Sequence, residues 1–495
     1  MTTTATIPAP GNLINGVWQP ATSGQTFENR NPADTDDVVA HHAASDDRDL
    51  DAAFAAAAAA FPGWRRTPGV ARGNILYKAA EILASRAESV ARELTREEGK
   101  TLREATGETM RAVAILRYFA GETSQPSGEN YPSANPTTML YTLREPLGVI
   151  TIITPWNFPI AIPAWKLVPA LAYGNAVVIK PASDAPLCTI RLAECLVEAG
   201  LPAGVLNAVT GSASALGDRL ITDERSVAVS FTGSDATGRH IQQLATAHAK
   251  KVQLELGGKN PAIVLADADL DHALTQVING AMMSTGQKCT ATSRAIVDRH
   301  IAAEFTERLA RKIGALTVGN GLDGATQVGP LINAAAAQNV ADGVERARSE
   351  GTELLVGGTR VDGDGLARGH FIAPALFNDV SPTSTLGQDE LFGPVLGVIP
   401  VDGMDEAISV ANNVRYGLSA SLFTRDLTRA LRFVQEIQAG IVHVNSETAG
   451  AEPQVPFGGY KGSSSYSREQ GKAAREFFTQ IKTVYLDPSP SPSPS

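Results

Sequence analysis

A single cysteine at position 289 lies within M-M-S-T-G-Q-K-C-T-A-T-S-R, residues 282–294. A thiolate can attack a carbonyl carbon, whereas a buried thiol behaves as a small apolar group. Cys289 is flanked by Lys288 in a glycine-containing turn, which favours a nucleophile. Because only the thiolate reacts, the site is expected to favour ionisation of Cys289. Cys188 and Cys195 fit an amphipathic helix and are predicted to be buried.

Polar residues that could assist a nucleophile lie at the ends of short β-branched runs. Asn157, in T-P-W-N-F-P, offers an amide donor, although asparagine also forms ordinary turns. Lys180 is either a solvated lysine or a cation for a ribose or phosphate. Small residues within 230–239, where a strand ends in a Gly/Ser turn, would let a ligand approach the backbone closely. Glu255 lies between leucines, which should raise its pKa and suit it to general base catalysis.

Strands that alternate with helices are predicted to bring these positions together. The first block comprises residues 149–154, 161–173, 176–180, 187–199, 205–209 and 227–231. A second alternating block runs from about residue 252 to Val444. Such alternation is typical of parallel sheets, in which ligands bind beyond the carboxyl ends of the strands. The sequence therefore predicts an α/β protein with two doubly wound parallel-sheet domains.

The segment before this alternation is predicted to be largely helical. Residues 21–48 are polar and are expected to be loop-rich, and the alanine-rich residues 50–61 form a helix that Pro62 and Gly63 should end. Further helices are predicted at 73–98 and 104–120, and extended segments at 137–144 and 483–486.

Composition limits the class of protein. The 495 residues carry a net charge of −10, which argues against a nucleic acid or an anionic membrane as partner. The three cysteines match no zinc pattern, so no metal is predicted, and they suit a reducing compartment. The first residues do not resemble a secretory signal, and a cytoplasmic location is expected. The Pro-Ser repeat at 488–495 is predicted to be disordered.

A literal G-x-G-x-x-G at residues 319–324 has the letters of a dinucleotide-binding fingerprint. The fingerprint needs a preceding strand and a following helix, whereas this run follows a predicted helix and leads into A-T-Q-V-G-P-L. A plain turn is therefore predicted.

Seven motifs in order carry a family resemblance over nearly the whole chain. They are P-W-N-F-P, K-P-A-S, F-T-G-S, L-E-L-G-G-K, G-Q-K-C, E-L-F-G-P-V and P-F-G-G-Y-K-G-S. The chain resembles the NAD(P)-dependent aldehyde dehydrogenases. The resemblance implies a Rossmann-like cofactor domain at 1–130 and 150–255 and a catalytic domain at 256–455. Segments 131–149 and 475–487 would pair as a small β element for oligomerisation, giving a homodimer or homotetramer.

The resemblance also implies the catalytic roles. Cys289 would attack the aldehyde, and Asn157 with the Cys289 backbone N–H would stabilise the oxyanion. Hydride would leave to the nicotinamide of NADP or NAD, and Glu255 would activate water to hydrolyse the thioester. The family usually has asparagine five residues before the nucleophile, where this chain has Ser284. This departure is expected to affect the fine-tuning of the site and not the presence of activity.

Cofactor contacts carry over from the same motifs. The implied residues are Ile153, Thr154, Trp156, Lys180, Ser183, Gly217, Phe231, Gly233, Ser234, Glu390 and Phe392. At Ser183, NAD-restricted relatives often have a carboxylate that repels a 2′-phosphate, so NADP is predicted to be accepted here.

The same motifs bear on which aldehyde is oxidised. Succinic-semialdehyde relatives have an arginine where this chain has Trp165, and the motifs around Cys289 and residues 452–471 look most like enzymes that oxidise 2,5-dioxopentanoate. Lys288 is either a cation for an acid semialdehyde or an exposed lysine. The alternatives are a broad-specificity or succinate-type semialdehyde dehydrogenase and, in other classes, a cofactor-independent cysteine hydrolase or acyltransferase, or a non-catalytic binding protein.

Overall fold

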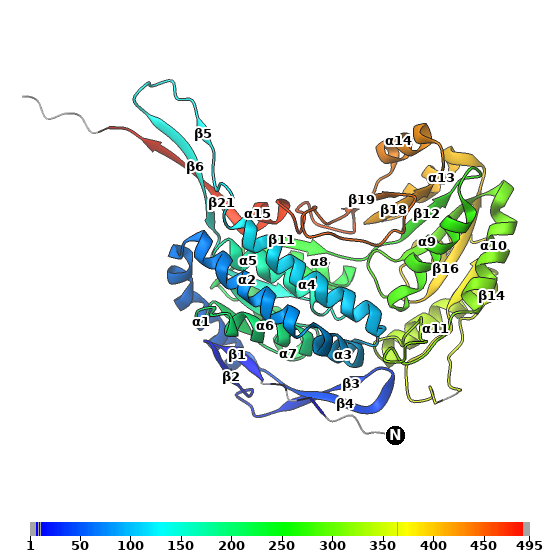
Figure 1. Ribbon diagram of the computed structural model, residues 1–495, viewed down its shortest axis with the longest axis horizontal. Helices are drawn as coiled ribbons and strands as arrows, with labels where there is room; N and C mark the ends of the chain where they lie inside the picture. Colours follow the sequence, from blue (N-terminus) through cyan, green and yellow to red (C-terminus); the bar gives the residue numbers. More distant parts are fainter. Residues whose placement is uncertain (1–5, 8, 10, 364, 489–495) are drawn as a thin grey trace, which may run out of the picture.

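The computed structural model describes residues 6, 7, 9, 11–363 and 365–488, so residues 489–495 of the predicted tail lie outside the described residues. Within the described residues, two seven-stranded sheets form separate lobes, and a three-stranded sheet projects as an arm from the first lobe (Figure 1). The predicted α/β class is thus confirmed. None of the helices in this part of the chain is long and apolar enough to cross a membrane.

The first sheet has the order β11-β10-β7-β8-β9-β1-β2. Neighbours from β11 to β9 are parallel, and β1 and β2 add an antiparallel edge. The strands are β1 (Asn12–Ile14), β2 (Val17–Gln19), β7 (Val149–Ile153), β8 (Ala176–Lys180), β9 (Leu206–Ala208), β10 (Ser226–Thr232) and β11 (Lys251–Glu255).

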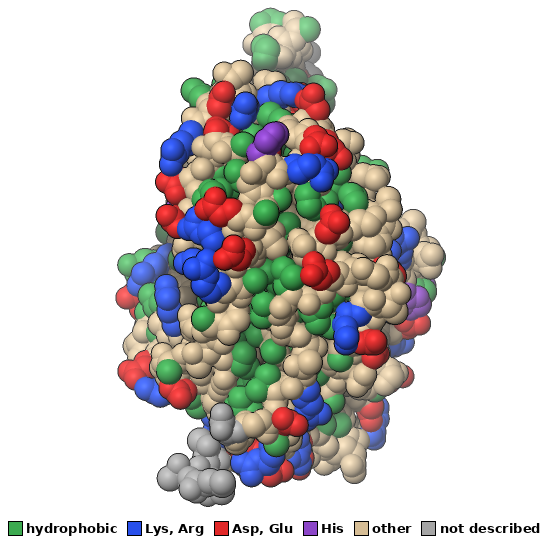
Figure 2. Space-filling model, turned by 90° about the vertical axis from the view of Figure 1, so that its right-hand side faces the viewer, with side chains coloured by type: hydrophobic (Ala, Val, Ile, Leu, Met, Phe, Trp, Pro, Cys, Tyr) green, Lys and Arg blue, Asp and Glu red, His purple; other side chains and the backbone are tan. Residues whose placement is uncertain are grey.

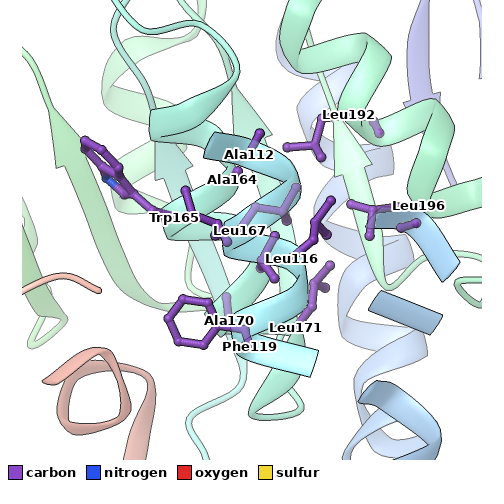
Figure 3. Close-up of a cluster of buried hydrophobic side chains, with 14 of the residues drawn as sticks. Ala112, Leu116, Phe119, Ala164, Trp165, Leu167, Ala170, Leu171, Leu192 and Leu196 are labelled. Carbon is purple, nitrogen blue, oxygen red and sulfur yellow. The ribbon is translucent and has the colours of Figure 1, made fainter. Parts of the chain in front are cut away.

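Helices cover both faces of this sheet because its central strands bury side chains on both sides. Ile150 and Ile152 join one apolar cluster, whereas Val149 and Ile153 contact another on the opposite face, as the two-residue period of a strand requires. Figure 3 shows the first cluster, formed by side chains of α4, α5 and α6. The indole of Trp165 extends away from the leucines of this cluster (Figure 3).

The helices of the first lobe differ from the prediction at two places. They are α1 (Asp47–Arg66), α2 (Gly69–Ser85), α3 (Ala87–Glu98), α4 (Leu102–Glu122), α5 (Ala161–Ala172), α6 (Leu187–Glu198), α7 (Ala213–Thr222) and α8 (Asp235–Ala247). Pro62 lies inside α1 instead of ending it. Buried Trp64 donates its indole N–H to Leu171 O at 3.2 Å, and this tertiary packing holds the last turn of α1. Arg86 interrupts the helix predicted at 73–98, a one-residue break that apolar periodicity does not reveal.

The predicted loop at 21–48 is largely an antiparallel pair, β3 (Thr26–Asn31) with β4 (Asp34–Ala43). Its inward positions include Asn29 and Asn31, both buried. Asn29 is held by a 2.7 Å hydrogen bond to Asp184 O. Because polar residues occupy the buried face, the usual alternation of apolar and polar residues is missing, and the prediction of a loop was wrong.

The second sheet has the order β14-β15-β16-β13-β12-β18-β19 and is parallel except for β14. The strands are β12 (Asn260–Val264), β13 (Thr292–Asp298), β14 (Glu353–Val356), β15 (Ala375–Asn378), β16 (Val395–Val401), β18 (Ser419–Phe423) and β19 (Ile441–Val444). The helices are α9 (Leu270–Met282), the 3-10 turn η1 (Met283–Gly286), α10 (Arg299–Gly314), α11 (Ala334–Ser349), α12 (Thr385–Gln388), α13 (Gly403–Asn412) and α14 (Leu427–Glu436). On the outer face of this lobe, basic and acidic side chains are intermingled (Figure 2).

The arm is a sheet of order β21-β6-β5 that brings the end of the chain back to its first third. Its strands are β5 (Asn130–Tyr131), β6 (Met139–Pro146) and β21 (Thr479–Leu486), preceded by α15 (Ala473–Phe478). A short pair, β17 (Tyr416–Gly417) with β20 (Tyr460–Lys461), lies in the second lobe. Apolar side chains exposed on the arm are Tyr131, Met139, Leu143, Ile481, Tyr485 and Leu486.

Candidate active site

Three of the predicted polar positions lie at the carboxyl ends of neighbouring strands. Strand β7 lies between β10 and β8, so the strand order reverses beside β7. Thr154 follows β7, Lys180 ends β8, and Gly233 follows β10. In doubly wound sheets, ligands bind in the crevice at this point of reversal. The structure therefore brings these positions to one edge of the first sheet.

Several polar groups at this edge retain hydrogen-bonding capacity. The Lys180 ammonium donates to Pro181 O at 3.0 Å, which leaves protons for other acceptors, and burial lowers its pKa to about 8. The hydroxyl oxygens of Thr154 and Thr232 are buried without a partner among the described residues. Ser234 caps the N-terminus of α8, the end of a helix that favours anions.

Glu390 and two aromatic rings form the side of this edge nearest the second lobe. Glu390 Oε1 accepts a hydrogen bond from Gly258 N at 2.9 Å, and burial raises the pKa of this carboxyl to about 7. The rings of Trp156 and Phe392 meet edge to face, with 5.5 Å between their centroids. The Glu390 side chain is thus fixed to the segment that follows β11 by its hydrogen bond with Gly258.

The other predicted cofactor positions differ in their surroundings. Phe231 is buried and Ile153 half-buried, so both contribute apolar surface. The Ser183 hydroxyl donates to Gly211 O at 2.8 Å. Gly217 lies on α7, where an added Cβ would meet open space.

The loop that carries Cys289 is held in an unusual conformation. Ser284 and Thr285 have φ values of 53° and 55°, which non-glycine residues rarely adopt. Ser284 N donates to Glu104 Oε1 of α4 at 2.6 Å, which anchors the loop to the first lobe. An added Cβ on Gly258 would be 2.6 Å from Cys289 O, so this glycine permits the loop to approach the chain after β11. The loop is therefore fixed from both lobes.

Asn157 lies beside this loop. Its Nδ2 donates to Gln287 O at 2.9 Å, and the second proton of the amide remains for another acceptor. The backbone oxygen of Asn157 accepts a 2.7 Å hydrogen bond from the Lys100 ammonium, which pairs with Glu108 at 2.7 Å. Glu108 also accepts from the backbone N–H groups at the start of α5. Asn157 is thus fixed to the loop by its side chain and to α4 by its backbone.

A cavity of about 860 Å³ opens in front of Cys289. Its wall is formed by one face of α4, the start of α5, the cysteine loop, residues 321–327 and residues 447–457. Cys289 is half-buried and lines this cavity. The rings of Trp165 and Phe457, with centroids 5.2 Å apart, give it an apolar side. The volume is ample for a small aldehyde.

The thiol of Cys289 is not ionised by its surroundings. Burial and the carboxyls of Glu390 and Glu255 raise its pKa to about 12, although backbone N–H groups of Thr290 and Cys289 act in the opposite direction. The expectation that the site favours the thiolate was therefore wrong, because burial and two nearby carboxyls outweigh the groups that favour ionisation. Attack on a carbonyl requires a base to remove the proton.

Glu255 ends β11 and is buried. Burial, followed by the charge of Glu469, raises its pKa well above the usual range, as predicted, and a 2.5 Å hydrogen bond from Ser464 opposes this rise. Glu255 Oε1 has no partner among the described residues. An added Cβ on Gly458 would be 2.8 Å from this oxygen, so the glycine leaves room for the carboxyl. Glu255 can therefore act as a base when it is deprotonated.

Two predictions about neighbouring residues are settled by burial. Lys288 is not exposed: its ammonium donates to Asn279 O at 3.2 Å and lies 3.8 Å from Glu447 Oε2. Cys188 and Cys195 are buried, as predicted.

The segment at 319–324 is a turn, also as predicted, and Gly321 and Gly324 line the cavity.

The charged residues of α4 that face the site were not among the predicted site residues. Glu104, Glu108 and Arg111 recur at helical spacing and line the cavity. The signal was present as charges on one face of the predicted helix at 104–120. Nothing in the sequence indicated that this face meets the cysteine loop, more than 170 residues away.

Comparisons with known proteins agree with this geometry. The sequence model of the aldehyde dehydrogenase family matches residues 18–484. The chain is 47% identical over 477 residues to an alpha-ketoglutaric semialdehyde dehydrogenase of Bacillus subtilis, covering 96% of this chain and 98% of that protein. It is also 47% identical to an alpha-ketoglutarate semialdehyde dehydrogenase of Haloferax volcanii, over 96% and 98% of the two chains. The betaine aldehyde dehydrogenase of Staphylococcus aureus, solved in complex with NAD+, superposes with a TM-score of 0.95 at 34% identity, covering 98% of this chain and 96% of that chain.

Proposed function

The chain belongs to the aldehyde dehydrogenase family, and from this we propose that it oxidises 2,5-dioxopentanoate to 2-oxoglutarate with NADP or NAD as hydride acceptor. The observation that carries the proposal is that Cys289 lines a cavity between the two lobes and that the Asn157 amide is hydrogen-bonded to the loop that carries this cysteine. The two relatives named for this semialdehyde support the substrate. The hydrolase, acyltransferase and non-catalytic alternatives receive no support from these relatives.

The residues at the edge of the first sheet fit a dinucleotide. The N-terminus of α8, capped by Ser234, suits a phosphate, and Lys180 has protons free for ribose hydroxyls. The unpartnered Thr154 hydroxyl and the Trp156–Phe392 ring pair suit the nicotinamide end. When bound there, NAD(P)+ supplies a hydride acceptor. We propose these roles also for Ile153, Ser183, Gly217, Phe231, Gly233 and Glu390.

Cys289 and Asn157 would carry the first half of the reaction. Because the pKa of the thiol is raised to about 12, we assign Glu255 as the base that takes its proton, since its own pKa is also raised. The sulfur then adds to the aldehyde carbon. The free proton of the Asn157 amide and the backbone N–H of Cys289 would donate to the oxyanion. Loss of hydride from this adduct leaves a thioester on Cys289.

Glu255 would carry the second half. After the proton taken from Cys289 has been released to solvent, the Glu255 carboxylate takes a proton from water, whose oxygen attacks the thioester carbon, and this proton later goes to the departing sulfur. The bond between carbon and Sγ of Cys289 breaks, which releases the carboxylic acid and returns the thiol. The unpartnered Oε1 of Glu255 is the oxygen that is free for this water.

Replacing Asn157 with alanine tests the oxyanion donor. We expect kcat to fall by about 10²- to 10³-fold with a smaller change in KM, because the amide is needed most in the transition state. Steady-state kinetics of Asn157→Ala and of the isosteric Asn157→Asp, which lacks the donor, would be compared. A variant that raised KM alone would show that Asn157 only positions the loop.

Replacing Ser183 with glutamate tests cofactor choice. The wild type is expected to use NADP, and Ser183→Glu should lower kcat/KM for NADP by about 10- to 100-fold while sparing NAD, because a carboxylate would repel the 2′-phosphate. Ser183→Ala, which keeps the site uncharged, is the matched control. NADP that is inert with the wild-type enzyme would refute the prediction.

A panel of aldehydes decides the substrate. The wild type is assayed with 2,5-dioxopentanoate, succinic semialdehyde and hexanal, each with NAD and with NADP. We expect the highest kcat/KM with 2,5-dioxopentanoate. Preference for succinic semialdehyde or equal use of hexanal would favour the succinate-type or the broad-specificity alternative.

We also propose that the chain forms a homodimer or homotetramer. The arm exposes Met139 and Tyr485 among other apolar side chains, and β19 leaves an unpaired edge on the second sheet. Exposed apolar surface and open strand edges are normally covered by a partner. This proposal assigns segments 131–149 and 475–487 to oligomerisation and keeps the cofactor domain at 1–130 and 150–255 and the catalytic domain at 256–455. We also propose a cytoplasmic location, because the three cysteines form no disulfide in the described structure.

A further inference from the structure

Arg111 is an unpaired cation in the wall of the cavity that Cys289 lines. Its Nη1 is buried and has no hydrogen-bond partner among the described residues. Burial lowers its pKa, against weaker opposing effects of Glu452 and Glu108, neither of which lies within 4.0 Å ion-pair distance in the described structure. Arg111 is half-buried, and a buried N–H group of a guanidinium that lacks a partner is costly to the fold, so its presence calls for an explanation.

The other buried charges of this wall are already satisfied. Lys288 lies beside Glu447 and Asn279 O. Glu108 pairs with Lys100, and the two carboxylate oxygens of Glu104 accept from Ser284 N and from Thr101. Unlike these neighbouring charged groups, the Arg111 guanidinium can still donate hydrogen bonds to a ligand.

The position of Arg111 on α4 suits it to bind a group at the end of a short substrate that is far from the aldehyde. Glu104 of this helix holds the loop of Cys289 through Ser284 N. Arg111 follows seven residues later on the same face, about 10 Å further along the helix axis. Trp165 and Phe457 supply an apolar side of the same cavity. The cavity thus combines a nucleophile, an apolar wall and a cation removed from the nucleophile.

We propose that Arg111 binds the terminal carboxylate of the substrate and makes the cavity selective for aldehydes that carry a distal carboxylate. This inference rests on the proposed function, whose substrate is an acid semialdehyde. A guanidinium offers two parallel N–H donors that match a carboxylate, and such charge-assisted pairs are strong. Lys288, considered for this role from the sequence, has its charge balanced by Glu447.

The test compares an acid substrate with a neutral one. For Arg111→Gln, we expect kcat/KM for 2,5-dioxopentanoate and succinic semialdehyde to fall by roughly 10- to 150-fold, mainly through KM, while hexanal changes less than about threefold. Arg111→Lys should recover part of the loss, because it keeps the charge and loses the fork. Arg117→Gln is the matched control, since Arg117 lies on α4 in an exposed ion pair with Glu81 at 2.9 Å.

Equal losses with acid and neutral aldehydes, or no loss with either, would overturn the role of Arg111. A second measurement separates this result from failure of the proposed function. Inhibition of hexanal oxidation by 2-oxoglutarate should weaken by a similar factor in Arg111→Gln. If the wild type ignored acid semialdehydes, the proposed substrate would be wrong; weakened inhibition would still support a carboxylate site at Arg111, and unchanged inhibition would refute it.

Discussion

Replacing Cys289 with alanine is expected to lower kcat/KM for 2,5-dioxopentanoate by at least about 10⁴-fold, because no covalent adduct can form without the sulfur. The first turnover should be lost as well, so rapid mixing of enzyme, cofactor and aldehyde should give no burst of reduced cofactor. Stopped-flow absorbance of the reduced nicotinamide measures both quantities.

Cys195→Ala is the matched control for this experiment. Cys195 is buried on α6, away from the cavity lining, so its loss should leave the burst intact. Cofactor binding by Cys289→Ala should be retained, which would show that the fold survives. Substantial aldehyde oxidation by Cys289→Ala would exclude a thioester route and with it the assigned roles of Asn157 and Glu255.

Replacing Glu255 with glutamine is expected to have the second largest effect and a different kinetic form. In the first half of the reaction, hydride loss requires only that the thiol of Cys289 has lost its proton. In the second half, hydrolysis of the thioester requires an activated water in every turnover. We expect a slowed burst of about one reduced cofactor per site, followed by a steady state about 10²- to 10⁴-fold slower than wild type. Mass spectrometry should find the acyl group attached to Cys289.

The pH dependence provides a separate check on Glu255. Because burial and Glu469 raise the pKa of Glu255 well above the usual range, the deprotonated base becomes more abundant as pH rises above that range. The wild-type rate should therefore rise with pH, and the steady state of Glu255→Gln should lose that dependence. A variant that kept both the wild-type turnover and its pH dependence would show that another group activates water.

Much of the fold was predictable because local pattern and tertiary environment agree. The predicted strand at 176–180 coincides with β8, which is buried on both faces and is apolar at every position before Lys180. Predictions failed where the two disagree. The β3 and β4 pair was missed because its inward positions include Asn29 and Asn31, and α1 continues through Pro62 because Trp64 packs against α5.

The sequence by itself determined the residue types of the site: one cysteine, one asparagine at a strand end and one glutamate before two glycines, in an order shared with a family. Only the tertiary structure decided the environment of these groups. It buries Cys289 near the carboxyls of Glu390 and Glu255, which raises the pKa of the thiol, places Glu447 beside Lys288, and leaves the buried Nη1 of Arg111 without a hydrogen-bond partner among the described residues. The physical reason is that chain order fixes which groups are available, whereas pKa and pairing depend on burial and on charges that only folding brings within a few ångströms.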